Sequence, residues 1–275
     1  MIFDEPTTFE AALEHQLAKQ VLPTAASSAE IAALPAAIRE RAFFSARTTH
    51  AGYLTDAHDL ITRLISPELA APGQSLSIPE VRTRLKEHLA SIGYQPDPRK
   101  RGTIQDLSSD RRINLIIDTQ TKMSRGYGQW LQGQSPAVLD QWPAQELYRL
   151  EARIHERDWN DRWVRAGGHL AAGRMVALKS SPIWLAISAF GNPYPPYDFR
   201  SGMDIMDVDR DDAVSLGLVG PTDTVAPHPR ALNETLQTDV PAGAPAALVD
   251  ALLAALGPQV QRQGDTLTLS PGRPA

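Results

Sequence analysis

Apolar residues in the first half of the chain recur every three or four positions, which is the spacing of an amphipathic helix. The longest such stripe runs from Leu34 to Leu64 and predicts a single helix of about 30 residues. Phe9, Leu13 and Leu17 stand four apart and predict a shorter helix before it. Helices are therefore expected over 8–20, 34–64, 79–92 and 109–131.

Polar residues mark the ends of several of these helices. Ser27 and Glu30 have the spacing of a capping box, in which each side chain bonds the backbone amide of the other residue. Ser77 and Glu80 repeat that spacing. Gly93 is expected to end the helix that starts there, because glycine adopts the left-handed conformation of a helix C-cap without strain.

The periodicity changes in the second half of the chain. Apolar and charged residues alternate from Tyr148 to Ile154, which predicts a half-buried strand. The runs "RMVALK" at 174–179 and "MDIMDV" at 203–208 predict two more strands. Short helices are expected within 158–168, 181–188 and 209–217, the last of them capped by Asp209.

The C-terminal part predicts an alanine-leucine helix over 245–256 and a hairpin around Gly264-Asp265. The expected fold class is α+β. It consists of a helical N-terminal region, a small α+β unit with a short antiparallel or mixed sheet, and a small helix-hairpin appendage. The three regions are expected at 1–98, 99–222 and 223–275.

Composition narrows the class of protein. The chain has 275 residues, 42% of them apolar, and a formal net charge of −5. It has no cysteine, which excludes disulfides, thiolate nucleophiles and cysteine-based zinc sites. No apolar run approaches the length of a membrane span, and the acidic N-terminus lacks the basic-then-apolar order of a secretory signal. We therefore expect a soluble, intracellularly made protein with no membrane partner.

Charge is distributed unevenly along the chain. Between Arg82 and Arg125 ten Lys/Arg stand against five Asp/Glu, whereas from Asp198 to Asp250 three Arg stand against ten Asp/Glu. Two interpretations stay open, namely two solvated faces or a phosphate-facing patch in the middle of the chain. The candidate residues for non-specific DNA binding in that patch are Arg99, Lys100, Arg101, Arg111 and Arg112.

Phe43 and Phe44 are adjacent within the long predicted helix, so they cannot lie on one face of it. At least one ring points away from the main apolar stripe. That ring either makes a second internal contact or belongs to a surface patch that binds a partner. Phe43 and Phe44 are therefore the candidate partner-binding residues.

The sequence "FGNPYPPYDFRSGM" at 190–203, here called the proline loop, combines prolines with aromatic residues. Proline fixes φ and has no N–H to donate, which excludes a helix or a central strand. The run is a poor match to the docking motifs PxxP and PPxY, and its large rings favour burial. We interpret it as a rigid structural loop in which Asp198 or Arg200 ties the backbone. Its central residues are Tyr194, Pro195, Pro196 and Tyr197.

No catalytic, cofactor or metal site is expected from the motifs. Asp207, Asp209 and Asp211 have the first ligand spacings of a calcium loop, but Asp212 and Leu218 stand where that loop needs glycine and glutamate. Helix capping explains these aspartates instead. The chain has no zinc-type histidine pair, P-loop, GxGxxG or GxSxG sequence.

His155 is the histidine that most suggests chemistry, because it follows a predicted strand with Arg153 and Arg157 on either side. In an RNA-cleaving site the histidine would act as general acid or base, and an arginine would stabilise the charge of the transition state. A histidine at the end of a strand is also a common surface or hydrogen-bonding residue. A nuclease or toxin-type enzyme is therefore the alternative function.

Four segments occur in a fixed order over about residues 105–210. They are "NLIIDTQTKMSRGYGQW", "ELYRLEARIHERDW", "GRMVALKSSPIW" and "NPYPPYDFRSGM". This ordered set resembles the phage head morphogenesis proteins, which are the minor head proteins similar to the F protein of phage Mu. In that family a helix ending near a Tyr/Gly segment precedes a strand, an Asp/Arg-rich turn, a second strand, a Pro-Phe/Trp turn and a "YPP" loop.

The chain departs from the family pattern at two places. The family's loop usually ends in Cys-Arg-Cys, whereas here Arg200 matches the arginine and both cysteines are absent, so a thiol or metal role for that ending is not available. The family's Arg-x-x-His after the first strand is out of register with Arg153, His155 and Arg157.

The resemblance implies a structural virion protein. It would be a phage or prophage minor head protein that acts in capsid assembly inside the head near the portal, and that is present in the host cytoplasm during assembly. Its partners would be the portal protein and/or the major capsid protein, with packaged DNA as a further contact. Residues 1–98 correspond to the region that meets the portal. The resemblance implies no cofactor.

Overall fold

The structure of the protein is a computed structural model. The residues that it describes are 10–66, 76–228, 236–240 and 244–270. The chain divides into two compact units: unit 1 combines residues 1–125 and 232–275, and unit 2 is the intervening segment 126–231. The α+β class expected from the sequence is confirmed.

Unit 1 is mainly helical. Its described helices are α1 (Glu10–Leu17), α2 (Ser28–Ala32), α3 (Ala36–Glu40), α4 (Ala51–Ile65), α5 (Ile78–Ser91), the first part of α6 (Asp110–Gly133), α11 (Ala246–Leu256) and the 3-10 turn η2 (Gly257–Gln259). α4 and α5 pack side by side, and with α6 they bury a core that includes Leu54, Ile61, Leu85 and Ile113. None of the helices within the described ranges is both long and apolar enough to cross a bilayer.

Two small sheets complete unit 1. The strands are β1 (Gln20–Val21), β2 (Ala42–Phe43), β6 (Leu236–Asp239), β7 (Val260–Gln263) and β8 (Thr266–Leu269). β1 and β2 pair in parallel, and the other three form an antiparallel sheet of order β6-β8-β7. The predicted hairpin is present, and Gly264 at its turn has a φ of +64°. α11 and this hairpin pack on Leu22, Ile38 and Ala42, so they belong to the core of unit 1 and are not an appendage.

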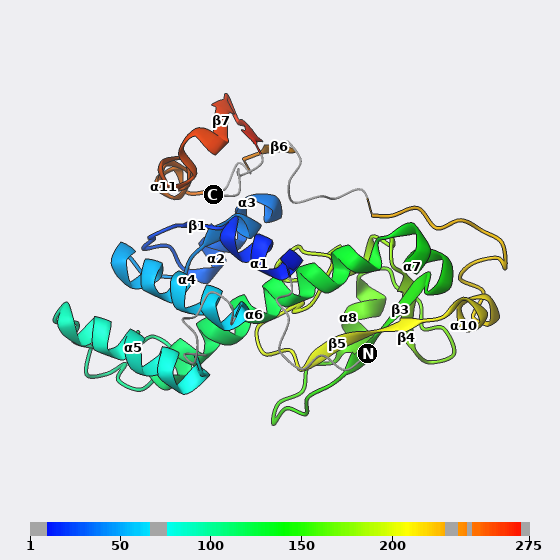
Figure 1. Ribbon diagram of the computed structural model, residues 1–275, viewed down its shortest axis with the longest axis horizontal. Helices are drawn as coiled ribbons and strands as arrows, with labels where there is room; N and C mark the ends of the chain where they lie inside the picture. The colour runs from blue at the N-terminus through cyan, green and yellow to red at the C-terminus, as the bar shows by residue number, and fades with distance from the viewer. Residues whose placement is uncertain (1–9, 67–75, 229–235, 241–243, 271–275) are drawn as a thin grey trace. The chain divides into compact units, whose positions relative to one another are not determined.

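Unit 2 is built on a three-stranded antiparallel sheet (Figure 1). Its strands are β3 (Ala144–Arg149), β4 (Met175–Leu178) and β5 (Met203–Val208), in the order β4-β3-β5. Its described helices are α7 (Pro136–Gln141), α8 (Trp159–Arg165), α9 (Ile183–Ala186), α10 (Arg210–Ser215) and the last two turns of α6. The proline loop connects α9 to β5.

The two faces of this sheet bury different clusters because successive strand residues point to opposite sides. Leu147 of β3 faces the rings of Trp163 and Trp184. Ala144 of the same strand belongs to the other cluster, with Val208. The sheet is therefore covered on both faces, and the proline loop adds to the aromatic one.

Local signals at helix ends predicted the structure well. Ser27 with Glu30 and Ser77 with Glu80 each form a complete capping box. Gly93 follows α5 with a φ of +71°. Asp209 caps α10 as expected, accepting a hydrogen bond from the Asp212 amide at 2.8 Å.

The single long helix expected over 34–64 is wrong. The chain instead forms α3, then β2, and starts α4 only at Ala51. β2 is held by parallel pairing with β1, where Gln20 lies opposite Ala42, and Arg47 has a φ of +58° that no helix accommodates. The helical spacing of apolar residues does not reveal this break, because strand pairing with distant residues overrides a weak helix propensity.

The strand expected over 148–154 lies earlier in the chain, as β3 at Ala144–Arg149. Its partner β5 begins at Met203, opposite Arg149, so the ladder ends there. The apolar residues read as the buried face are not buried, since Leu150 is 56% and Ile154 97% exposed. They lie in the loop between β3 and α8.

The expected regions at 1–98, 99–222 and 223–275 differ in extent from the two units. Residues 99–125, with the first part of α6, belong to unit 1, and so does the C-terminal helix with its hairpin. The reason is that Ile113, Ile116 and Ile117 on α6 share the apolar cluster of α4 and α5.

Candidate functional site

The proline loop starts in a tight turn around one hydroxyl group. Ser188 Oγ accepts hydrogen bonds from the backbone amides of Phe190, Gly191 and Asn192 at 3.2, 3.0 and 3.3 Å. The same hydroxyl donates to the buried Asn192 side-chain oxygen at 3.1 Å. The Asn192 amide group then donates to the carbonyl of Tyr194. These side chains satisfy backbone groups that no strand or helix pairs at this point.

The two tyrosines of the loop anchor it in two aromatic clusters. Tyr197 is fully buried and stacks on Trp184 with ring centroids 6.1 Å apart. Burial raises the pKa of the Tyr197 hydroxyl well above its ordinary value. Tyr194 packs against Tyr127 and Trp130 of α6 at 5.7 and 5.9 Å. Burial of large rings is a strong source of stability, so the loop is fixed at both positions.

Gly126 marks the place where the loop backbone meets α6. A Cβ atom at Gly126 would lie 2.0 Å from the carbonyl oxygen of Pro195 and 3.4 Å from the Tyr194 ring. The side chains of Tyr194, Pro195, Pro196 and Tyr197 are all buried. Their burial agrees with the interpretation of the proline loop as a structural wall.

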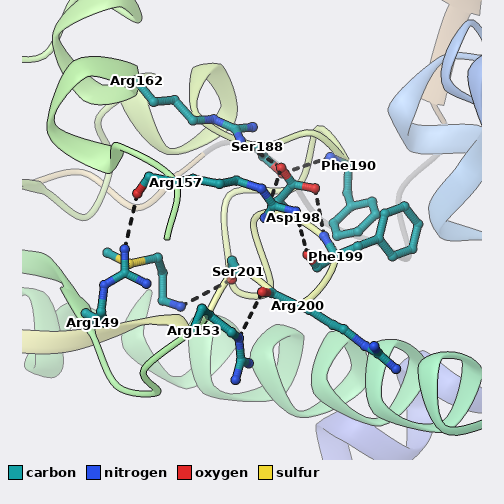
Figure 2. Close-up of polar contacts among 11 residues, drawn as sticks. Arg149, Arg153, Arg157, Arg162, Ser188, Phe190, Asp198, Phe199, Arg200 and Ser201 are labelled. Atoms are coloured by element: carbon teal, nitrogen blue, oxygen red, sulfur yellow. Dashed lines mark hydrogen bonds and ion pairs between the residues drawn. The ribbon is translucent and has the colours of Figure 1, made fainter. Parts of the chain in front are cut away.

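Asp198 is the anionic centre of the loop (Figure 2). Its Oδ2 lies 2.9 Å from Nη1 of Arg162 and 3.5 Å from Nη1 of Arg157. Its Oδ1 accepts a hydrogen bond from the Phe199 amide at 2.8 Å. The Arg162 guanidinium also lies over the ring of Trp159, 4.6 Å from the centroid. These contacts join the loop to α8 through a charge-assisted pair that is largely shielded from water.

Three arginines hold backbone carbonyls in and beside this segment, as Figure 2 shows. Arg153 Nε donates to the carbonyl of Arg200 at 3.0 Å, and Arg157 Nη2 donates to that of Phe199 at 3.0 Å. Arg149 Nη2 donates in turn to the carbonyl of Arg157 at 3.2 Å. A guanidinium has several N–H donors in a fixed plane, so a few arginines can fix a loop that has no regular pairing of its own.

The end of the loop has a left-handed backbone. Arg200 has a φ of +48° and Gly202 a φ of +72°. The carbonyl of Gly202 accepts the amides of Leu150 and Glu151 at 2.9 and 3.0 Å, and a Cβ at Gly202 would lie 2.4 Å from the Glu151 carbonyl oxygen. A left-handed arginine costs about 1–2 kcal/mol. The hydrogen bonds from Arg153 and the neighbouring loop offset that cost.

The arginine-held segment displays apolar side chains at the surface. Phe199 is 41% exposed and meets Phe190 edge-on, with ring centroids 4.7 Å apart. Leu150 and Ile154, in the loop after β3, are also exposed. A rigid support that presents exposed apolar groups is suited to contact with another macromolecule.

Four of the five residues of the predicted basic patch are exposed. Arg99, Lys100 and Arg101 lie in an exposed turn, and Arg111 is exposed in the first turn of α6. The turn is built around Asp97, whose side chain accepts the Arg99 amide at 3.0 Å. These four cations lie in unit 1, away in sequence from the proline loop.

Arg112 does not belong to that exposed set, which corrects the expectation. Its guanidinium turns into unit 1 and donates through Nη2 to Ser45 Oγ and to the carbonyl of Ala46. Burial lowers the pKa of Arg112, although neighbouring tyrosines oppose the effect. Arg112 therefore fastens the segment before α4 and is not presented to a phosphate backbone.

The Phe43 and Phe44 rings pack inside unit 1. Phe43 is fully buried and meets the ring of His58 edge-on at 5.2 Å. Phe44 is partly buried against two other apolar clusters. Of the two expected alternatives, the second internal contact is the one observed. The burial of Phe43 excludes it from a partner surface.

Arg153, His155 and Arg157 carry the alternative hypothesis of an enzyme. His155 lies exposed in the loop between β3 and α8. Arg157 is engaged by Asp198 and the carbonyl of Phe199. Within the described ranges, no group of three or more His, Asp or Glu side chains is placed to hold a metal ion.

The sequence does not connect Arg149, Arg153 and Arg162 with the proline loop, because Arg149 and Arg153 alternate with apolar residues as on the solvent face of a strand. A signal for the connection is the density of arginine from 149 to 162, opposite a single aspartate in a loop that needs backbone partners. The loop residues that Arg153 and Arg162 contact, Arg200 and Asp198, lie 47 and 36 positions away along the chain, which local spacing does not reveal.

Comparison of the chain with known proteins assigns no function to this site. No protein-family model matches the chain, and neither a curated protein nor a solved structure shows a significant match to it.

Proposed function

We propose that this chain is a phage or prophage minor head protein that acts in capsid assembly at the portal. The observation that carries the proposal is the ordered set of four segments that resembles the head morphogenesis family. Three of these segments contain most of β3, all of β4 and most of the proline loop of unit 2, and they reach the first residues of α8, α9 and β5. Segments that fold together as one unit support an interpretation as one shared module, because chance matches have no reason to be contiguous in space.

The chemistry of unit 2 supports a structural role over a catalytic one. At the proline loop, Arg153 and Arg157 donate hydrogen bonds to backbone carbonyls. Asp198 forms an ion pair with Arg162. Catalytic arginines, by contrast, point toward the position where charge develops on a substrate. Exposed Phe199 and Ile154 are suited to a binding surface.

In this proposal residues 1–98 meet the portal protein and/or the major capsid protein, and the protein resides inside the head. The exposed cations Arg99, Lys100, Arg101 and Arg111 contact packaged DNA without sequence preference. Binding of that kind is electrostatic and decreases with salt. The host cytoplasm is the compartment in which assembly takes place.

Co-assembly tests the proposal. The full chain is expressed together with the portal and major capsid proteins encoded beside its gene, and assembled heads are purified by sedimentation and analysed by mass spectrometry. We expect the chain in the head fraction, and we expect it to bind the portal protein when the major capsid protein is left out.

The outcome against the proposal is also defined. If folded chain stays out of the heads and binds neither coat protein, the head-protein assignment is wrong.

A further inference from the structure

α1 buries polar side chains where a short helix of a globular protein ordinarily buries apolar ones. Leu13 of the expected stripe is half-buried against the core cluster that includes Ala12, but Leu17 is 51% exposed. His15 and Gln16 are buried at 1% and 0% exposure. α1 is therefore docked on unit 1 by polar contacts in addition to the apolar contacts of Ala12 and Leu13.

These polar contacts form one buried network between α1 and α6. His15 Nδ1 lies 3.1 Å from Ser124 Oγ, and Ser124 Oγ donates to Gln16 Oε1 at 3.1 Å. Lys19, two residues after α1, donates through Nζ to Gln120 Oε1 at 2.8 Å and to Gln16 Oε1 at 3.3 Å. All five side chains are buried, and the ammonium group of Lys19 meets amide oxygens where a carboxylate would be the usual partner.

Charged and titratable groups of both signs lie on the elements around Lys19. From α6, the neutral Gln120 contacts it. The other charged or titratable residues include Glu10, Glu14 and His15 on α1, Glu40 at the end of α3, Arg41 just before β2, Asp56, His58, Asp59 and Arg63 on α4, and Asp118, Lys122 and Arg125 on α6. Burial lowers the pKa of Lys19 from 10.5 to about 7, and the negative charge of Glu40 opposes that effect.

We propose that α1 and the two residues after it form a detachable element, whose docking onto α4 and α6 is controlled by the protonation of Lys19. His58 Nε2, at 2.9 Å from the carbonyl of Gln16, is the contact from α4 that is broken on release. A docked neutral amine keeps its contacts with the two glutamine side chains. A protonated amine loses its water shell on docking without gaining a carboxylate.

The direction of the pH effect follows from these two states. Released Lys19 is protonated up to about pH 10.5, whereas docked Lys19 is protonated only below about pH 7. Docking is strongest where the lysine is neutral in both states and weakens as pH falls from 10.5 to 7. Below about pH 7 both states carry the proton, and this residue causes no further loss. Between about pH 9.5 and about pH 7.5 the opening equilibrium of α1 should rise on the order of 50-fold.

Native-state hydrogen exchange on the full chain measures this opening. Exchange of the α1 backbone amides is followed by mass spectrometry at about pH 7.5 and about pH 9.5 and corrected for the intrinsic rate at each pH. Amides of α5 in the same sample report the global unfolding of unit 1. We expect α1 to open independently of α5 and to open far more at the lower pH.

Three substitutions separate the lysine from other sources of pH dependence. Lys19→Met removes the titration and should abolish the pH dependence of α1 opening, whereas Lys100→Met, in an exposed turn, should leave it unchanged. Glu40→Gln should increase α1 opening below about pH 7, where docked Lys19 is protonated, because it removes the charge that favours protonated Lys19. The proposal is overturned if α1 exchanges only together with α5, or if the pH dependence persists in Lys19→Met.

Discussion

Arg162 on α8 and Asp198 in the proline loop form an ion pair with 2.9 Å between Nη1 and Oδ2, across 36 positions of sequence. The pair is partly shielded, with side-chain exposures of 25% and 19%. It links the side chains of the proline loop and α8, and its removal makes a direct test of the loop's structural role.

Asp198→Ala should lower the stability of unit 2 by about 1–3 kcal/mol, because it leaves two guanidinium groups without their carboxylate. Urea unfolding followed by tryptophan fluorescence measures this specifically, since all five tryptophans lie between Trp130 and Trp184. Arg165→Ala, which breaks an exposed pair on the same helix, should change stability by no more than about 0.5 kcal/mol. Equal effects of the two changes would contradict the role given to Asp198.

Gly126→Ala should destabilise unit 2 by about 2–3 kcal/mol, because the new Cβ would lie 2.0 Å from a backbone oxygen that cannot move away alone. Gly133→Ala on the same helix is the matched control. Its Cβ meets nothing nearer than the Lys179 ammonium at 3.6 Å, and it should be neutral or gain up to about 1 kcal/mol of helix propensity. The same fluorescence-detected urea titration decides between them.

Alkaline pH should destabilise unit 2 through Tyr197. Its hydroxyl stays protonated in the folded state above the pH at which an unfolded tyrosine ionises, so the unfolded state loses the proton first and stability falls above about pH 10. The slope attributable to this group is about 1.4 kcal/mol per pH unit. Comparing native chain and Tyr197→Phe between about pH 9 and about pH 11 should show a shallower loss in the variant. An identical pH profile would mean that Tyr197 ionises equally easily in both states.

DNA binding by the exposed cations should be weak, independent of sequence and sensitive to salt. Four contacts, from Arg99, Lys100, Arg101 and Arg111, imply a slope of log K against log salt of about −3 to −4. Fluorescence anisotropy with labelled duplex DNA should show binding at low salt that an Arg99/Lys100/Arg101→Ala variant loses. If this variant still binds DNA, the DNA contact lies on another surface of the protein.

Nuclease activity is not expected. Transfer RNA, ribosomal RNA and duplex DNA incubated with the chain, with and without magnesium, should stay intact on a gel. Cleavage that His155→Ala abolishes would instead establish the enzyme reading, because contamination would be unaffected by that substitution.

Features set by neighbouring residues could be predicted from the sequence. Ser77 with Glu80, Asp209 with Asp212, and the turn at Gly264 depend on spacings of three residues or fewer, and each is present in the structure. The α+β class follows from such local elements, since a stripe of period 3.6 gives way to runs of period two along the chain.

Features set by distant residues could not be predicted. The pairing of Gln20 with Ala42 breaks an otherwise convincing helix stripe. α1 faces the core with His15 and Gln16 because Ser124, more than a hundred positions away, offers a polar partner. The arginine contacts of the proline loop also join residues that are distant along the chain. Periodicity reports how apolar a face is and carries no information on which polar groups meet after folding.

Unit 1 is formed by two segments of the chain that are separated by unit 2, and this has a consequence for biosynthesis. Leu252, Leu256 and Leu267 complete an apolar cluster whose other members include Leu22 and Ile38. On the ribosome, every residue of unit 2 is made before those three leucines, so unit 2 has all its own contacts available first. The first hundred or so residues must wait with part of their apolar surface uncovered. A nascent chain stalled before Leu252 would therefore be a natural client for chaperones, even with unit 2 already folded.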